Sequence, residues 1–321
     1  MSEYPWLVST WQHWQDLLQQ GALPNAILCQ AKSGTGIEDI VEKLAMAVVC
    51  KNSEQQACGF CHSCELSKGE NHPDIHWIRP EKEGKNIIVD QIREANRLAL
   101  ESSQLGGKRI IIISPAEAMN ESAANALLKT LETPPEQCHF VLLTTDKSRL
   151  LATITSRCQT WLVGALNKEA LLSWLSTQPT LDNQIPPDWQ HIKMYADSPL
   201  LAVEFIKQKK TQEFEQLQRL LLKVVQTKQV NITEAQTLFK LEPLDKIRWL
   251  TYILSDVQKS HFGILTEINN SDFIQLSQLL PYQLAYEQYH ALVKLQQLLS
   301  TSSGLNTELL IVDWLLKFTL A

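Results

Sequence analysis

The sequence predicts an α/β domain with a parallel sheet, followed by an all-α remainder. Three observations lead to this fold class. Runs rich in Val and Ile alternate with helical patterns up to about Leu162, as is typical of strands joined by crossover helices. From Asn167 onward these runs stop and amphipathic patterns follow one another. The chain of 321 residues is also too long for a single hydrophobic core, because one domain has roughly 100–200 residues.

The elements of the first half follow in chain order. Trp11 and Trp14 lie at helical spacing before a stop at Gly21. Asn120 can cap a later helix that the prolines at 134 and 135 end. Strands are expected at 25–29, 74–80, 108–114, 139–145 and 160–163, and further helices at 37–50, 89–103 and 150–155.

The second half reads as helices throughout. Amphipathic patterns occupy 168–177, 198–207, 213–226, 243–258, 273–280 and 307–318. A polar segment at 207–212 indicates a break between a small helical domain and a C-terminal bundle. We therefore expect three domains, at 1–165, 166–208 and 209–321.

The charge balance limits the classes of function. Lys and Arg number 29 and Asp and Glu 35, which gives 29 − 35 = −6. This argues against a surface that binds a phosphate backbone broadly, although a local basic patch stays open. No run of about 18 apolar residues exists, and the N-terminal segment lacks the pattern of a secretory signal. We expect a cytoplasmic protein without a membrane segment.

The stretch 29–41 has the placement of a phosphate-binding loop, between an expected strand and an expected helix. An intact P-loop reads G-x-x-x-x-G-K-[ST] and directs its Lys to the phosphates and its Ser or Thr to Mg²⁺. Here Ala, Ile and Glu occupy the first-glycine, Lys and Ser/Thr positions, and the Glu would repel a nucleotide. The degenerate loop residues are Ala31, Gly34, Gly36, Ile37 and Glu38. We expect this chain to bind no ATP.

A second part of the ATPase machinery is also missing. An active P-loop ATPase ends its next core strand in acidic residues that hold Mg²⁺ and activate water. The strand expected at 108–114 ends in Ser114 and Pro115, and Glu117 lies two or more residues too far along. We therefore expect no intrinsic ATPase activity. The rival, an active ATPase with an unusual loop, needs a substitute lysine, and Lys32 is the one nearby candidate.

Four of the seven cysteines lie within residues 50–64, with the spacing C-x7-C-x2-C-x2-C. Four thiolates satisfy tetrahedral Zn²⁺ coordination, and a filled set of protein ligands indicates a structural rather than a catalytic ion. The expected zinc ligands are Cys50, Cys58, Cys61 and Cys64. His62 and His72 could replace one of these ligands, but we read them as surface residues. We read Cys29 and Cys138 as buried apolar packing.

Two other interpretations of the cysteine cluster stay open. A C-x-x-C pair is also a redox signature, although such a pair normally opens a helix after a strand and this one lies in a polar insertion. The segment could instead be a zinc-dependent DNA-binding module, which its few basic residues do not favour.

The ordered motifs of the chain resemble a known family. Residues 123–161 read AANALLKTLETPPEQCHFVLLTTDKSRLLATITSRCQTW. They are similar to the clamp-loader branch of the AAA+ family, with its N-A-L-L-K-x-L-E-E-P-P, Thr-Thr and S-R-C pattern. With PWL at 5–7, the cysteine insertion, HPD at 72–74 and GLNTELLIVDWLLKF near the end, the chain resembles the delta-prime family of bacterial DNA polymerase III subunits over nearly its full length. Thr133, where the pattern usually has Glu, is one departure.

This resemblance implies both a fold and a role. It implies an AAA+ α/β domain with a zinc insertion, a small lid-type helical domain and a C-terminal helical collar. It implies assembly with tau/gamma and delta subunits in a hetero-pentamer that loads the sliding clamp on primed DNA. The chain would act there as a non-hydrolysing stator, within a DNA-directed DNA polymerase (nucleotidyltransferase) holoenzyme.

The resemblance also assigns one residue to catalysis in a neighbour. Ser156, Arg157 and Cys158 map onto the S-R-C motif, whose Arg enters the ATP site of the adjacent subunit. A guanidinium at the γ-phosphate stabilises transition-state charge, worth roughly 10³–10⁵ in rate for other arginine fingers. Thr144 and Thr145 match positions that sense the γ-phosphate in active members, and we assign them no role here.

Overall fold

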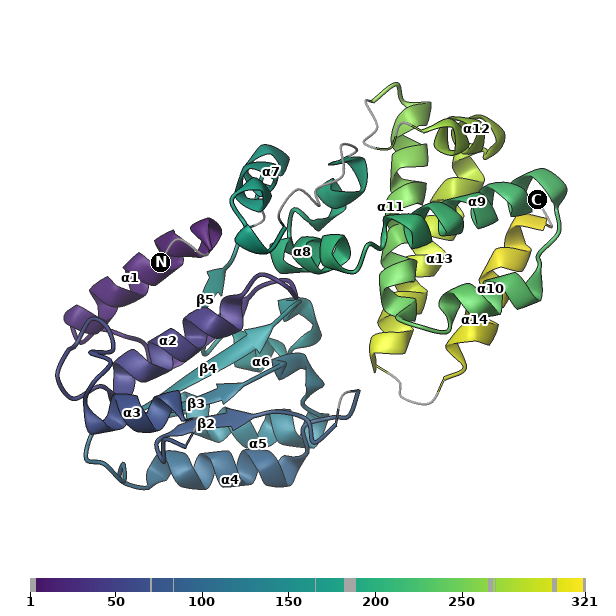
Figure 1. The fold of residues 1–321 in the computed structure, drawn as a ribbon. Coiled ribbons are helices and arrows are strands. Elements are labelled where there is room, and N and C mark those ends of the chain that lie inside the picture. Colours follow the sequence, from purple (N-terminus) through teal and green to yellow (C-terminus); the bar gives the residue numbers. More distant parts are fainter. Residues whose placement is uncertain are drawn as a thin grey trace. The chain divides into compact units, whose positions relative to one another are not determined.

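The computed structural model describes residues 4–69, 71–82, 84–164, 166–181, 189–264, 268, 270–301 and 305–319. The chain divides into two compact units, one of residues 1–166 with 197–200 and one of residues 167–196 with 201–321 (Figure 1). A further division of the helical part near residue 208 stays a prediction.

Five parallel strands form the sheet in the described part of the first unit, in the order β2-β3-β4-β1-β5. They are β1 (Ala26–Gln30), β2 (Ile75–Ile78), β3 (Arg109–Ile113), β4 (Cys138–Thr144) and β5 (Gln159–Leu162). Every residue of β3 and β4 is buried, as expected for apolar strands covered on both faces. The predicted α/β class is confirmed.

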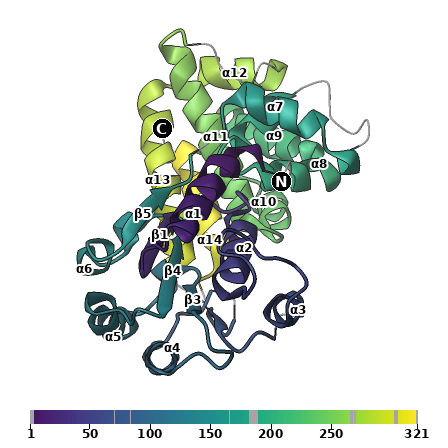
Figure 2. The ribbon, with the colours of Figure 1, turned by 90° about the vertical axis from the view of Figure 1, so that its left-hand side faces the viewer.

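Helices cover both faces of this sheet (Figures 1 and 2). Because successive side chains of a strand point to opposite faces, Ile110 and Ile112 of β3 enter a core with α1 and α2, while Ile111 and Ile113 enter one with α4 and α5. The helical segments of this unit are η1 (Pro5–Leu7), α1 (Val8–Gln19), α2 (Ile37–Val49), α3 (His62–Lys68), α4 (Val89–Leu100), η2 (Ala116–Ala118), α5 (Glu121–Glu132), η3 (Lys147–Arg149) and α6 (Ala152–Thr155).

Helix α5 begins and ends where its sequence predicts. The Asn120 side chain accepts a hydrogen bond from the Ala123 N–H and so satisfies one of the free donors of the first turn. The helix ends at Glu132, because proline disfavours helical backbone in the residue before it and cannot donate to the ladder. Glu132 is thereby fixed at the helix end.

The described part of the second unit is helical, as predicted. Its segments are α7 (Lys168–Ser176), η4 (Pro179–Leu181), η5 (Trp189–Tyr195), α8 (Pro199–Lys207, which begins in the first unit), α9 (Thr211–Thr227), α10 (Ile232–Phe239), α11 (Pro243–His261), α12 (Ser271–Leu279), α13 (Tyr282–Thr301), α14 (Thr307–Leu316) and η6 (Lys317–Thr319). The described helices include none that is long and apolar enough to span a membrane.

Two buried polar side chains of the second unit, Gln218 and Lys210, are paired within it. Gln218, buried in α9, exchanges two amide hydrogen bonds with Asn270, at 2.7 and 3.1 Å. The buried Lys210 ammonium lies 2.6 Å from a Glu242 carboxylate oxygen and 3.3 Å from one of Asp245. Such pairing is what buried polar groups require.

Candidate functional site

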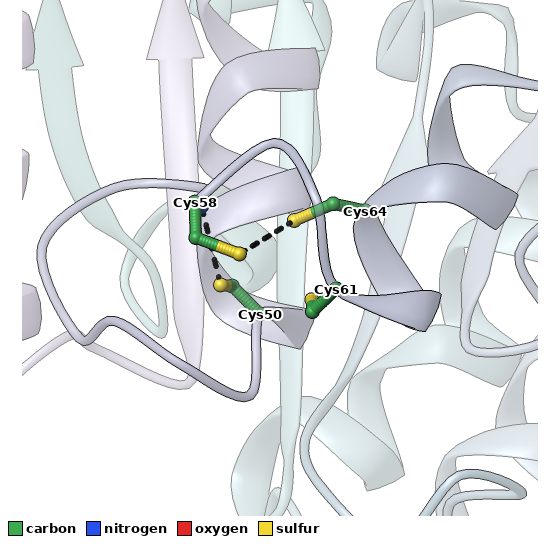
Figure 3. Close-up of side chains that lie close together, drawn as sticks. All are labelled: Cys50, Cys58, Cys61 and Cys64. Carbon is green, nitrogen blue, oxygen red and sulfur yellow. Dashed lines mark hydrogen bonds between the residues drawn. The ribbon is translucent and has the colours of Figure 1, made fainter.

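The four clustered cysteines converge at one place beside α2 and α3. Cys50 ends α2, Cys58 lies in the following loop, and Cys61 and Cys64 lie at and inside the start of α3. Their four sulfur atoms all lie within 4.8 Å of one another (Figure 3), and those of Cys58 and Cys64 are 3.9 Å apart. Tetrahedral ligands about 2.3 Å from Zn²⁺ lie roughly 3.8 Å from each other. The cysteines are therefore positioned to bind a metal ion.

Backbone N–H groups prepare two of these sulfurs for the anionic form. Burial opposes ionisation of Cys50, but N–H groups of Cys58 and Asn52 donate to it, and its pKa is held below the ordinary value. Hydrogen bonds, the largest from the Lys51 N–H, lower the pKa of Cys61 to about 6. Burial raises the pKa of Cys64 to about 12, so that this thiol would ionise only with a cation beside it. This donor set suits a thiolate-binding ion.

Lysine side chains attach the cysteine cluster to its surroundings. The Lys51 ammonium donates to the carbonyl oxygen of Leu105 and, at 3.4 Å, to that of Gly106. The Lys68 ammonium donates to the Gly59 carbonyl at 2.6 Å. The cluster is therefore connected to the loop between α4 and β3.

A buried ion pair supports that same loop. The Arg109 Nη2 and Asp74 Oδ1 atoms are 2.9 Å apart, and both side chains are 2% exposed. The Asp74 carboxylate also accepts hydrogen bonds from the Gln104 and Leu105 N–H groups, at 2.9 and 3.1 Å. Burial opposes ionisation, but these donors and Arg109 hold the pKa of Asp74 below its usual value. The pair fixes the loop that Lys51 contacts.

The two histidines near the cluster differ from each other. His62 is exposed, as predicted. His72, predicted to be a surface residue, is buried, and this prediction is wrong. Its Nδ1 accepts a hydrogen bond from the Asp74 N–H at 3.1 Å, which draws the ring into the turn before β2. Cys29 and Cys138 are buried in the strands, and that prediction is confirmed.

The degenerate loop has the course of a phosphate-binding loop. It runs from β1 to α2, and Gly34 and Gly36 have φ angles of 79° and 73°, in the left-handed region that favours glycine. The Ala31 N–H donates to the Thr144 carbonyl at 2.9 Å, and the Leu200 N–H donates to the Gly34 carbonyl at 2.9 Å. Both loop contacts are made within the first unit.

Side chains from the N-terminal segment cover this loop. The Tyr4 ring packs against Gly36 so closely that a Cβ there would lie 2.9 Å from the ring. The Tyr4 hydroxyl donates to Asp39 at 2.6 Å, and the Trp6 indole N–H donates to the Thr35 carbonyl at 2.8 Å. The N-terminal segment thus packs on the loop and is bonded to the Thr35 carbonyl and the Asp39 carboxylate.

The two positions that would hold Mg²⁺ contact each other instead. The Ser114 hydroxyl, at the end of β3, donates to the Glu38 carboxylate at 2.9 Å. Ile37, at the Lys position, is buried. Glu117 accepts hydrogen bonds from the N–H and hydroxyl of Thr145, at 3.0 and 2.6 Å. Ser114 and Glu38, and Thr145 and Glu117, are therefore directed at one another.

Arg157 lies at the surface, after α6. Its Nη2 is 2.6 Å from a Glu132 carboxylate oxygen, and the side chains are 33% and 51% exposed. Its Nη1 donates to the Thr153 carbonyl at 2.9 Å. The neighbouring Cys158 packs against the core, and burial raises its pKa to about 11. The S-R-C motif therefore combines a partly buried anchor, Cys158, with a guanidinium near solvent.

The comparison with known proteins decides the family. Residues 7–166 match the family described as DNA polymerase III, delta subunit, and residues 207–319 match its C-terminal family. The DNA polymerase III subunit delta' of Haemophilus influenzae is 32% identical over 98% of this chain and 96% of its own length. The chain belongs to the DNA polymerase III delta' family. The Escherichia coli member is 31% identical over 99% of this chain and 95% of its own.

The fold agrees with this assignment. A gamma subunit-related protein of DNA polymerase III from Thermotoga maritima has a TM-score of 0.50 and 20% identity, and the match covers 95% of this chain and 98% of that one. At that identity the likeness concerns the fold alone. The predicted AAA+ class, an α/β domain followed by helices, is confirmed, and so is the resemblance inferred from the motifs.

Sequence reasoning missed several partners in these sites. Nothing in the sequence showed that Tyr4 would cover Gly36 or that Ser114 would donate to Glu38, because these pairs are 32 and 76 positions apart. Glu132 was part of a recognised motif, but its ion pair with Arg157 was not foreseen. The location of a Glu at a helix end, just before the two prolines, was the available signal.

Proposed function

We propose that this chain is the non-hydrolysing stator subunit of a clamp loader. It assembles with tau/gamma and delta subunits in a hetero-pentamer that places the sliding clamp on primed DNA. In this role it binds no ATP and donates Arg157 to the ATP site of a neighbour. The proposal includes a cytoplasmic location, and it draws on the delta' relatives for the complex.

The observation that carries the proposal is the hydrogen bond between Ser114 and Glu38. Mg²⁺ in a P-loop site needs a hydroxyl from the loop and a carboxylate from the next strand. Here the loop position supplies a carboxylate, the strand supplies a hydroxyl, and each uses the other. With Ile37 buried at the Lys position, that position supplies no ammonium for the phosphates, which supports the absence of hydrolysis.

Arg157 supports the second half of the proposal. An arginine finger must reach outside its own chain, and a guanidinium that is 33% exposed at a helix end can do so. Its planar fork matches phosphate oxygens. The backbone behind it is held by the buried Ile154 and by Cys158. A fixed backbone and an accessible guanidinium together suit a side chain that is offered to a partner subunit.

We further propose that Cys50, Cys58, Cys61 and Cys64 hold a structural zinc ion. Zinc would offset part of the charge of the thiolates and close the loop between α2 and α3. No position is left for water or substrate once four thiolates are bound. The cluster contributes local rigidity in this proposal and takes no part in chemistry.

The test is a calorimetric titration of Mg-ATP into the isolated, zinc-loaded chain, with phosphate release measured on the same sample. We expect neither binding at millimolar Mg-ATP nor turnover. Tight binding with hydrolysis would contradict the proposal and would favour the rival ATPase. The Lys32→Ala variant would then show whether that exposed lysine replaces the one missing from the loop.

A further inference from the structure

An ion pair joins Glu132, in the L-E-T-P-P segment, to Arg157, in the S-R-C motif. The proposed function does not explain why these two motifs contact each other. Glu132 ends α5 and lies directly before the residues Thr133, Pro134 and Pro135. Arg157 follows α6, 25 positions further along the chain. Helices α5 and α6 pack on each other, so the carboxylate and the guanidinium meet at one corner of the first unit.

The contacts of Arg157 use one side of its guanidinium. Nη2 donates to Glu132 at 2.6 Å, and Nη1 donates to the Thr153 carbonyl at 2.9 Å and weakly to the Ser156 hydroxyl at 3.5 Å. A guanidinium has five N–H donors in a fixed plane. Nε and the second hydrogen of Nη2 have no partner among the described residues. The group is thus oriented mainly by the Glu132 carboxylate and the Thr153 carbonyl and still has donors to offer.

Both acceptors have well-defined positions. The Thr153 carbonyl belongs to α6, next to Ile154, which is completely buried. Glu132 is fixed by the end of α5, whose start Asn120 caps. The carboxylate is 51% exposed, so it can orient the arginine without removing it from solvent. A side chain held by packed neighbours keeps the geometry that catalysis needs.

We propose that Glu132 is a positioning residue for Arg157. This inference rests on the proposed function, because it assigns to Glu132 the orientation of the arginine finger that serves the neighbour's ATP. Glu132 and the Thr153 carbonyl hold one edge of the guanidinium, and the remaining donors face the γ-phosphate. In this role Glu132 contacts neither ATP nor the attacking water and acts through Arg157 alone.

The experiment is a double-mutant cycle in the reassembled clamp loader. The variants are Glu132→Ala, Arg157→Ala and the two together, with Glu132→Gln as the conservative change. Single-turnover ATP hydrolysis is measured at the site next to this chain, together with the ATP concentration that gives half-saturation. Glu136→Ala is the matched control, because Glu136 is an exposed carboxylate four residues further on that forms no ion pair in the described part of the chain.

We expect Glu132→Ala to lower the hydrolysis rate about tenfold and to leave half-saturation within about twofold. Glu132→Gln keeps an oxygen acceptor at the same place and should restore most of the rate. In the Arg157→Ala background, Glu132→Ala should have no further effect, because residues that act as one unit are not additive. Glu136→Ala should match the unmodified complex.

Three results would overturn the inference, and they differ from one another. A faster rate for Glu132→Ala would mean that the carboxylate competes with phosphate for the arginine. An equal loss in both backgrounds would mean that Glu132 acts on assembly or folding. An unchanged rate for Arg157→Ala would remove the proposed function itself, and the inference would fall with it.

Discussion

Arg109 and Arg157, two of the first-unit arginines that have carboxylate partners, lie in very different surroundings, and the comparison separates structure from function. Arg109 is 2% exposed and uses all five of its donors. They go to Asp74 and to backbone carbonyls of Leu98, Glu101 and Ser102. Arg157 is 33% exposed and uses its donors in part. A fully satisfied guanidinium can only support the fold, whereas a partly satisfied one can be offered to a phosphate.

The largest effect on stability should come from the Asp74 region. Asp74→Asn leaves Arg109 buried without an opposite charge, and breaking such a pair costs about 3–5 kcal/mol. Urea unfolding of the zinc-loaded chain would measure the loss. Asp90→Asn, which removes the partner of Arg93 in an exposed pair, is the control and should change the free energy of unfolding by less than about 1 kcal/mol. Equal losses for both variants would contradict the comparison.

Acid should affect the buried region before the Arg157 corner. Burial lowers the pKa of His139 to about 4 and also lowers those of His72 and His76. The unfolded chain therefore binds more protons between about pH 6.5 and 4, and stability falls as the pH drops through this window. His139 alone would contribute roughly 3 kcal/mol at most. The pKa of Asp74 is lowered, so the stability that this carboxylate contributes is lost only below about pH 4.

Unfolding curves at several pH values would check this expectation. His139→Asn can keep the donor to the Pro24 carbonyl, which lies 3.0 Å from Nδ1, but does not titrate. Its stability should therefore vary less with pH than that of the unmodified chain. A His139→Asn profile as steep as the original would remove His139 as the cause.

Removal of the metal should loosen the loop near Asp74 and leave the surroundings of Arg157 unchanged. Lys51 connects the cysteine cluster to the loop at 105–106, and the Asp74 carboxylate binds the same loop. We expect a chelator to lower hydrogen-exchange protection of the Gln104 and Leu105 amides about tenfold, or about 1.4 kcal/mol. The Arg157 amide, bonded to the Ile154 carbonyl, should keep its protection. Equal loosening at both places would mean that the metal supports the whole unit.

The smallest effect should be that of Glu132→Ala on stability. Its pair with Arg157 is half exposed, and such pairs contribute about 0–1 kcal/mol. Thermal unfolding should therefore shift little for this variant. A loss of stability near that of Asp74→Asn would show that the pair of Glu132 and Arg157 supports the fold. It would remove the contrast between Arg109 and Arg157.

The sequence predicted those parts of the molecule that depend on local pattern. Val and Ile runs located the strands, the spacing of Cys50 to Cys64 located the cluster, and the S-R-C motif located Arg157. Pairings between distant positions could not be predicted, because they depend on how β2, β3 and the helices meet. Asp74 and Arg109 are 35 positions apart, and composition alone does not show that they are buried together.

The wrong reading of His72 has a similar cause. Its segment, NHPD, is polar and typical of an exposed turn. The ring is nevertheless buried, because its Nδ1 accepts the Asp74 N–H and the same turn directs Asp74 toward Arg109. The burial of that histidine is linked to the ion pair between Asp74 and Arg109, which are 35 positions apart, and could not be predicted from the local sequence.

The most direct test of the account is Arg157→Ala in the reassembled clamp loader, with Arg157→Lys beside it. We expect hydrolysis at the neighbouring ATP site to fall about 10³-fold, with unfolding of the isolated variant unchanged within about 0.5 kcal/mol. Arg157→Lys should recover little, since an ammonium lacks the planar fork. An unchanged hydrolysis rate, or a loss explained by an unstable variant, would contradict the claim that this chain serves its neighbour through Arg157.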